Sequence, residues 1–203
     1  MKNALLHFSR KATEQPDYLI RCQSDFADAV PELTAEIKQK FLVSRTAKTD
    51  FAPFCARFGI ELPDDIKAYI NLYWHASVCG VYDCCKQNEA GEGSYQFDEG
   101  LVLFPVIRRI GETDDDVLFH ENGVYRLTEE LYEDYADSVK DVGDYICIGW
   151  TEHSAYKILY QVSTGEIYLE SSTEGSVTDE KPIAASLPEL INRLYFLHGT
   201  DLK

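Results

Sequence analysis

The sequence has few basic residues for its number of acids. It contains 19 Lys and Arg against 35 Asp and Glu, which gives a formal net charge of -16 at pH 7. A protein that binds nucleic acid or an anionic membrane surface directly needs clustered Lys and Arg to neutralise phosphate groups. The charge balance therefore predicts no direct binding to nucleic acid, and it favours a basic protein surface as the partner.

Long hydrophobic runs are also missing. No stretch of the sequence approaches the roughly 18 apolar residues that a membrane-spanning helix needs. The first residues, MKNALLHFSRKATEQPDYL, lack the apolar core of roughly 7–15 residues that a signal peptide contains. From these two absences we expect a cytoplasmic protein with no direct membrane insertion.

The usual signatures of catalysis are absent. The sequence has no glycine-rich loop of the kind that binds phosphate and no Gly-x-Ser-x-Gly motif. Asp114, Asp115, Asp116 and His120 carry groups that bind divalent metals, and Cys84 is a nucleophile, but none of them stands in a catalytic motif. We predict no catalytic residues and no cofactor, and we keep an uncharacterised enzyme or metal-binding protein as the minor alternative.

Paired C-x2-C motifs are missing too, although three of the six cysteines (Cys79, Cys84 and Cys85) lie within the seven residues CGVYDCC. Structural zinc sites usually show two such pairs. His75 stands four residues before Cys79 and would share a helix face with it, which leaves a metal site as a minority interpretation. The favoured interpretation is a helix that passes through a turn of small residues into a strand, with the cysteines as thiols.

What the chain does contain is enough apolar sequence for one folded domain, since 45% of its 203 residues are hydrophobic. Apolar residues at helical spacing predict three helices. One begins near Pro31, and the other two cover residues 61–77 and 186–199. Stretches rich in β-branched and aromatic residues predict strands within 100–107, 143–152 and 155–172, the last with a hairpin turn at 163–165. Because helices and antiparallel strands are segregated along the chain, the predicted class is α+β, an antiparallel sheet with helices packed against it.

Negative charge is concentrated between Glu112 and Asp144. This segment contains twelve acids and only two basic residues, Arg126 and Lys140. A charge run is usually a solvated face, which is the plain alternative. The interleaved Phe and Tyr residues argue against a disordered tail, and we predict that the segment and the sheet form a negative concave face for a basic partner. The predicted contact residues are Glu112, Asp114, Asp115, Asp116, Glu133, Asp134, Asp137, Asp141, Trp150 and Glu152.

The order of these segments resembles the SUKH superfamily. The resemblance rests on LPDDIKAYINLYW, the strand GLVLFP, the acidic segment, the strand YICIGW, the hairpin YKILYQVSTGEIYLES and the final helix IAASLPELINRLYFL. Members of the superfamily include homologues of yeast cell-wall regulators, bacterial toxin-immunity proteins and the SecY-interacting Syd proteins. Within it the chain is most similar to Syd, through HENGVYRL at 120–127 and the hairpin at 163–166. The likeness covers residues 60–197 and does not extend to the first 60 residues.

The resemblance implies a SUKH-like binding module without catalytic residues. Residues 1–60 would form an N-terminal helical extension packed on the core, and residues 61–203 the α+β domain, in one compact unit. The favoured function is that of a bacterial immunity protein that occludes the basic site of a nuclease-type toxin, because immunity proteins tolerate divergence and insertions. The alternative is a Syd-like protein that binds the cytoplasmic loops of SecY, since loops on that side of the membrane are enriched in Lys and Arg.

Overall fold

The computed structural model describes residues 1–87, 94–136, 142–171, 176–178 and 181–196, with the backbone alone for residues 83–87 and 94–99. In these ranges the chain forms seven α-helices, three 3-10 helices and seven strands. The α-helices are α1 (Lys2–Thr13), α2 (Tyr18–Arg21), α3 (Pro31–Lys40), α4 (Ala52–Phe58), α5 (Asp64–Leu72), α6 (Val124–Tyr135) and α7 (Leu187–Arg193). The 3-10 helices are η1 (Gln23–Phe26), η2 (Asp116–Leu118) and η3 (Val142–Asp144). The strands are β1 (Val43–Ser44), β2 (Tyr73–Trp74), β3 (Val78–Gln87), β4 (Ser94–Leu103), β5 (Tyr145–Thr151), β6 (Lys157–Gln161) and β7 (Ile167–Leu169).

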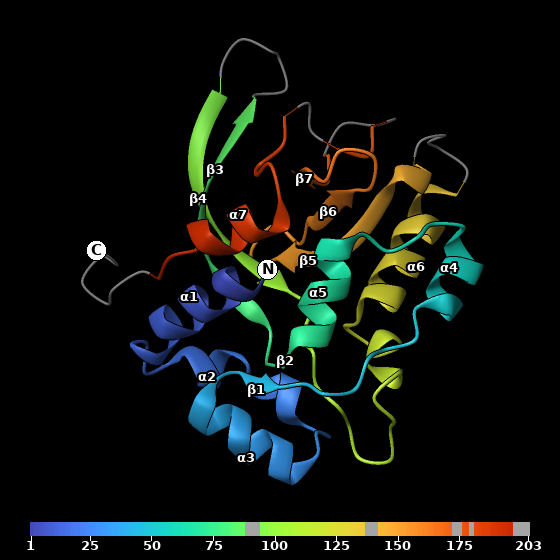
Figure 1. Cartoon of the computed structure of the whole chain (residues 1–203). Helices are drawn as coiled ribbons and strands as arrows, with labels where there is room; N and C mark the ends of the chain where they lie inside the picture. Colours follow the sequence, from blue (N-terminus) through green and yellow to red (C-terminus); the bar gives the residue numbers. More distant parts are fainter. Residues whose placement is uncertain (88–93, 137–141, 172–175, 179–180, 197–203) are drawn as a thin grey trace.

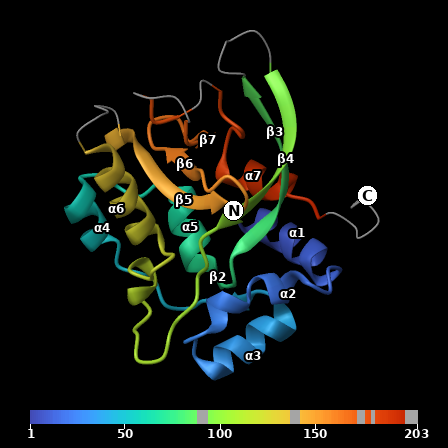
Figure 2. The same cartoon turned by 180° about the vertical axis from the view of Figure 1, so that it is seen from behind.

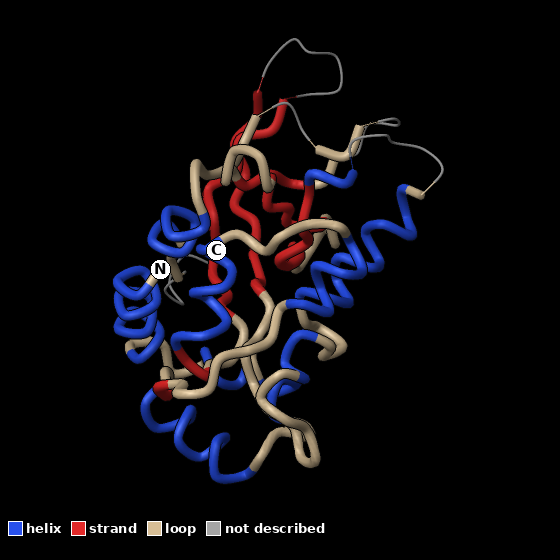
Figure 3. The backbone as a smooth tube through the Cα atoms, turned by 45° about the vertical axis from the view of Figure 1, so that its right-hand side comes forward, coloured by secondary structure: helices blue, strands red, loops and turns tan. Residues whose placement is uncertain are grey.

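Five strands form one antiparallel sheet in the order β3-β4-β5-β6-β7, and β1 and β2 form a separate two-stranded sheet. Figure 3 shows the strands at the centre of the molecule, with the helices around them. The predicted α+β class with an antiparallel sheet is therefore confirmed. The strands β3 and β4 extend beyond the rest of the sheet (Figure 1), because β5 pairs only with Leu101–Leu103 of β4.

Strands β5, β6 and β7 lie within the predicted ranges, while β4 begins at Ser94, six residues before the predicted range 100–107. Strand β4 ends two residues before Pro105, which cannot donate a backbone hydrogen bond to the sheet. Strands β6 and β7 are joined by the predicted hairpin turn, in which Gly165 has a φ of 80°, a value that glycine adopts without steric strain. The register of β5 against β6 shifts between Cys147 and Gly149. A side chain on Gly149 would place its Cβ 2.0 Å from the carbonyl oxygen of Val102, so this close approach of β5 to β4 requires glycine.

Two of the predicted helices begin where the sequence indicates. Helix α3 begins at Pro31, and α7 begins directly after Ser186, whose Oγ accepts a hydrogen bond of 3.3 Å from the backbone N–H of Glu189. Helix α7 ends at Arg193, earlier than predicted, and Leu197 lies outside the described residues. None of the helices in the described ranges has the length and apolar character needed to cross a membrane.

The predicted helix over residues 61–77 is too long. Helix α5 ends at Leu72, and Tyr73 has extended dihedral angles of -146° and 149° at the start of β2, which pairs with β1. The aromatic pair Tyr73-Trp74 fits a strand better than a helix, and the pairing with β1 overrides the helical spacing. His75 and Cys79 therefore do not share a helix face, and Cys79 lies in β3. The geometric basis for a metal site at these two residues is wrong.

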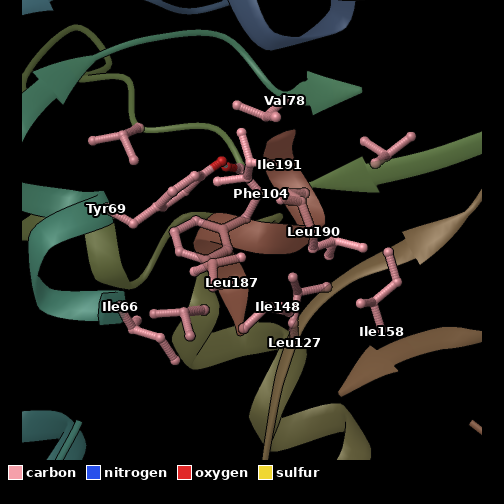
Figure 4. Packing of buried hydrophobic residues seen from close by; sticks show 14 of the residues in the cluster. Ile66, Tyr69, Val78, Phe104, Leu127, Ile148, Ile158, Leu187, Leu190 and Ile191 are labelled. Carbon is pink, nitrogen blue, oxygen red and sulfur yellow. The ribbon is translucent and has the colours of Figure 1, made fainter. Parts of the chain in front are cut away.

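The hydrophobic core lies between the sheet and helices α5, α6 and α7. Figure 4 shows Tyr69 of α5 beside Phe104, to whose carbonyl oxygen the Tyr69 hydroxyl donates a hydrogen bond of 2.9 Å. Leu127 of α6 and Leu190 of α7 reach the same core from the other two helices. Buried residues from the first 60 positions belong to this one cluster, and α1 packs against α5 and α7 (Figures 1 and 2). Trp74 is buried, with 8% of its surface exposed.

Candidate functional site

The predicted contact residues fall into three groups in the structure. Four of them (Glu112, Asp114, Asp115 and Asp116) lie in the connection between β4 and α6, which we call the acidic loop. Glu133 and Asp134 lie in the last turn of α6, and Trp150 and Glu152 lie at the end of β5. Asp137 and Asp141 lie outside the described residues.

The structure separates the acidic loop from the acids at the end of α6. Helix α6 has twelve residues, which at about 1.5 Å per residue is a length of roughly 18 Å. The loop precedes its first turn, while Glu133 and Asp134 are in its last. Figure 1 accordingly places the loop at the bottom of the molecule and the end of α6 near the top. A partner that touches both groups must cover the whole length of the helix.

A buried arginine holds the acidic loop in place. Arg45, with 7% of its surface exposed, donates a hydrogen bond of 2.9 Å to the carbonyl oxygen of Ile70 and another to the carbonyl oxygen of Asp114. Its guanidinium also lies over the ring of Trp74, 4.2 Å from the centroid. Burial lowers the pKa of Arg45 despite the nearby carboxylates of Asp114 and Asp115. One side chain thus ties α5, β2 and the loop together.

Three carboxylates of the acidic loop are oriented by neutral donors. Glu112 accepts a hydrogen bond of 3.0 Å from the backbone N–H of Arg109, and Asp115 accepts one of 2.7 Å from that of Asp50. Asp116 accepts bonds of 2.6 Å and 2.8 Å from the backbone N–H and the hydroxyl of Thr113, and these bonds lower its pKa. Because an amide or a hydroxyl carries no net charge, these bonds orient the carboxylates without placing a positive charge beside them.

Cations from outside the loop reduce its net charge. The guanidinium of Arg108 lies 3.4 Å from the carboxylate of Asp114, and Arg45 lies close to Asp114 and Asp115. The count of charges along the sequence misses this effect, because Arg45 is about 70 residues away in the chain. The loop is consequently less negative than the sequence alone indicates.

Helix α6 carries two exposed acids that have no cation partner among the described residues. Glu129 lies between Arg57 and Arg126, and the carboxylate of Asp134 lies 2.5 Å from the ammonium group of Lys157. Glu130 and Glu133 are exposed, and no Lys or Arg of the described ranges lies within ion-pair distance of either. These two carboxylates are three positions apart and therefore share one face of the helix.

The aromatic side chains beneath this face make α6 a firm platform. Phe54 and Phe58 of α4 pack edge-on against Tyr125 of α6, with ring centroids 6.3 Å and 5.2 Å apart. Phe58 also packs against Tyr132, about two turns further along α6, with the ring centroids 5.2 Å apart. Such aromatic pairs each contribute about 0.5–1.5 kcal/mol beyond the area they bury. The acids of α6 are therefore presented from a packed helix and not from a mobile segment.

Lys157 of β6 is largely buried and lies close to two acids. Only 20% of its side chain is exposed, and its ammonium group lies 2.5 Å from Asp134 and 3.6 Å from Glu170. It pairs across the sheet with Trp150, which is half-buried. Trp150, one of the predicted contact residues, is partly packed against the core.

Glu152 is engaged in an intramolecular ion pair. Its two carboxylate oxygens lie 2.5 Å and 2.6 Å from one guanidinium nitrogen of Arg21 at the end of α2. The backbone N–H of Glu152 donates a bond of 2.7 Å to the carbonyl oxygen of Gly100. A partner that used this carboxylate would have to displace Arg21, so of the ten predicted contact residues Glu152 is among the least available.

The alternative chemistry has no assembled site in the described residues. They contain no group of three or more His, Cys, Asp or Glu side chains that could hold a metal ion. His120 is buried, and burial lowers its pKa, which the nearby Arg109 lowers further. The side chains of Cys84 and Cys85 are not among those described.

Two residues of consequence were missed by sequence reasoning. Arg45 positions the acidic loop, and Cys22 lies beside Cys79 with a sulfur–sulfur distance of 3.8 Å. Both act through contacts with residues far away in the chain, so no local pattern indicates them.

In comparisons with known proteins, no protein-family model and no curated protein matches this chain.

Proposed function

We propose that the protein is a non-catalytic module that binds a basic protein partner through its acidic surface. The observation that carries this proposal is the face of α6 on which Glu130 and Glu133 are exposed without a cation partner among the described residues. The acidic loop, whose carboxylates are oriented by backbone amides, extends the negative surface past the start of the helix. The net charge of -16 adds a long-range field of the same sign.

The mechanism is electrostatic attraction followed by steric occlusion. Complementary charge accelerates the diffusional encounter with a basic partner and disfavours acidic ones. Carboxylates that are already held by backbone amides lose little conformational entropy when a partner binds, so less of the binding free energy is spent on ordering them. Binding of this kind weakens as salt rises, because the screening length falls to about 8 Å at physiological ionic strength.

The partner class that we favour is a nuclease-type toxin, which the protein would neutralise as a bacterial immunity protein. A nuclease needs a positively charged site to hold nucleic acid, and an acidic surface of fixed geometry is complementary to such a site. The SUKH-like order of elements supports this class. A Syd-like role, with the basic cytoplasmic loops of SecY as partner, rests on the same charge argument and is the second outcome of the test.

Reversing two charges on α6 tests the proposed surface. We expect the double variant Glu130→Lys and Glu133→Lys to bind the basic partner roughly tenfold more weakly at low salt, mostly through slower association, and to lose much of the salt dependence. Both residues are exposed, so the variant should fold as the native protein does. Association kinetics over a range of salt concentrations, with the partner immobilised, measure both effects.

The matched control changes the same charges elsewhere. Glu14 and Asp17 are also exposed and three positions apart, at the end of α1 and before α2, and their replacement by Lys alters the net charge equally. This control should retain most of the affinity. If both variants lose affinity to the same extent, only the net charge matters and the α6 surface is not the binding site.

The partner itself is identified by capture from the lysate of the cells that make the protein. The native protein and the Glu130→Lys, Glu133→Lys variant are used in parallel, washed at low salt and eluted with salt. A basic soluble nuclease retained by the native protein alone supports the immunity function, and SecY retained in the same way supports the Syd-like function. Retention of no protein by the native form in preference to the variant would contradict both.

A further inference from the structure

Two buried cysteines from distant parts of the chain lie in contact. Cys22 follows α2, and Cys79 is the second residue of β3, 57 positions later. Their sulfur atoms are 3.8 Å apart, and the residues are 2% and 3% exposed. Both are free thiols in the structure. This contact accounts for one cysteine of the CGVYDCC stretch, and the proposed binding function does not use it.

We propose that Cys22 and Cys79 are a redox-sensitive pair, which a small hydroperoxide converts into a reversible disulfide that clamps the N-terminal segment onto strand β3. A disulfide has a sulfur–sulfur bond of about 2.05 Å. The two atoms therefore have to approach by less than about 2 Å, a displacement that side-chain rotation can supply. The proposal is independent of the partner and of the acidic surface.

Hydrogen bonds to the backbone of Ser77 keep the two thiols next to each other. The hydroxyl of Tyr18 donates a hydrogen bond to the carbonyl oxygen of Ser77, and the thiol of Cys22 lies 3.6 Å from the same oxygen. The carboxylate of Asp25 accepts a bond of 2.7 Å from the backbone N–H of Ser77. Three side chains of the segment 18–25 thus bind one residue, two positions before Cys79. This fixed attachment keeps the sulfur atoms adjacent.

Of the two thiols, Cys79 is the one that reacts first with the hydroperoxide. The contact with the Cys22 sulfur, in which either thiol can donate, lowers the pKa of Cys79 against the effect of burial, and the nearby guanidinium of Arg21 lowers it further. The pKa of Cys22 is raised by the same contact and by burial. A thiolate is the nucleophile toward peroxides, so the asymmetry assigns attack to Cys79 and resolution to Cys22.

The reaction is a two-electron oxidation. The Cys79 thiolate attacks a peroxide oxygen of ROOH, the O–O bond breaks, and after proton uptake Cys79 is a sulfenic acid while ROH leaves. The Cys22 sulfur then attacks the Cys79 sulfur, and the hydroxyl leaves as water with the proton of Cys22. In sum, two thiols and ROOH give one disulfide, ROH and water. A dithiol reductant reverses the change by thiol–disulfide exchange.

Access for the oxidant requires only a local opening. The segment that covers Cys79 consists of α2 and η1, which have four residues each. Short elements of this size open at a lower free energy than the whole domain. By contrast, Cys147 is fully buried, contacts no second sulfur among the side chains that the structure describes, and has its pKa raised to about 12 by burial. Cys55 is partly exposed and is the described cysteine most open to unwanted oxidation.

The test uses the full chain with Cys55, Cys84 and Cys85 replaced by Ser, which leaves Cys22, Cys79 and Cys147 as the only thiols. The protein is treated with hydrogen peroxide, the remaining thiols are alkylated, and the intact mass and the peptides are analysed. We expect a loss of two hydrogen atoms, a peptide cross-link between Cys22 and Cys79, and full reversal by dithiothreitol. The thermal unfolding midpoint should rise by roughly 5–10 °C on oxidation, because the cross-link closes a long loop of the unfolded chain.

Two single variants in the same background complete the test. With Cys22→Ala the oxidised product at Cys79 should stop at the sulfenic acid or proceed to the sulfinic acid, and with Cys79→Ala the Cys22 thiol should remain unoxidised. Thermal unfolding of each variant before treatment establishes that it is folded. Peroxide-treated protein in which both Cys22 and Cys79 remain alkylatable, or in which disulfides form only between molecules, would overturn the proposal.

Discussion

Replacing Arg45 with Met is expected to lower the free energy of unfolding by about 3 kcal/mol. Met is an apolar side chain of similar length, so the variant removes the guanidinium, including its contact with the Trp74 ring, and creates little empty space. The carbonyl oxygen of Ile70 then loses this donor, and that of Asp114 keeps only the long bond of 3.4 Å from the Thr49 hydroxyl, in a site where 7% of the Arg45 surface is exposed. A buried acceptor without a partner costs about 1–3 kcal/mol, and hydrogen bonds from a charged donor are at the upper end of that range.

Chemical denaturation of the two proteins measures this difference, and Arg57→Met is the matched control. Arg57 is also an arginine near a carboxylate, Glu129, but 51% of its side chain is exposed. Exposed ion pairs contribute about 0–1 kcal/mol, so the control should remain close to the native protein. Equal effects of the two substitutions would show that Arg45 does not hold the loop.

The Arg45 variant also connects the fold to the proposed function. The acidic loop is attached to α5 and β2 through this guanidinium, and to the residues before α4 through the bonds from the Thr49 hydroxyl to Asp114 and from the Asp50 N–H to Asp115. If the loop loosens, its carboxylates must be ordered again when a partner binds, and the cost appears as weaker binding. The substitution is therefore expected to weaken the binding of a basic partner even though it makes the net charge more negative.

Much of the fold was predictable because its signals are local. A serine two residues before a proline starts a helix in many chains, and a glycine between two runs of β-branched and aromatic residues forms a turn. The helix that begins after Ser186 and the turn at Gly165 are both confirmed. Helix α6 shows how a local signal can be obscured. Its buried residues Val124, Leu127 and Leu131 have helical spacing, which indicates a helix. The prediction for this segment rested instead on the acids between them and described only a negative face.

The errors arise where distant residues decide the outcome. Helix α5 ends at Leu72 because Tyr73 and Trp74 pair with Val43 and Ser44, about thirty positions earlier in the chain. The acidic segment predicts one negative face, but a helix of twelve residues divides it, and arginines from other elements neutralise part of it. Pairings of this kind cannot be predicted from one sequence, since no feature of either segment indicates which distant segment it contacts.

The second large effect that we expect is a loss of stability in acid, caused by His75. This residue is 2% exposed, and burial, together with the nearby positive charge of Arg45, lowers its pKa from 6.5 to about 4. Its Nδ1 lies 2.8 Å from the carbonyl oxygen of Ala76, which assigns the proton of the neutral ring to Nδ1. In the unfolded chain the ring titrates near its ordinary pKa.

The sign of the effect follows from proton uptake. Between pH 6.5 and about 4 the unfolded chain binds a proton at His75 that the folded protein does not bind, so the free energy of unfolding falls as the pH falls. The full loss from this residue is about 3 kcal/mol and is complete near pH 4. His120, whose pKa is also lowered, contributes in the same direction, while the raised pKa of Asp25 contributes in the opposite direction.

The variant His75→Asn isolates the contribution of His75. The Asn amide can donate to the Ala76 carbonyl as the imidazole does, but it does not titrate, and His120 and Asp25 are unchanged in both proteins. The absolute stability of the variant is lower at pH 7, because Asn does not replace the contact between the imidazole and the Tyr69 ring, whose centroids are 4.8 Å apart. The slope of stability against pH is therefore the quantity to compare, by urea denaturation at intervals from pH 7 to pH 4. The native protein should lose about 3 kcal/mol more than the variant over this range, and parallel curves would mean that His75 is protonated in the folded state as readily as in the unfolded chain.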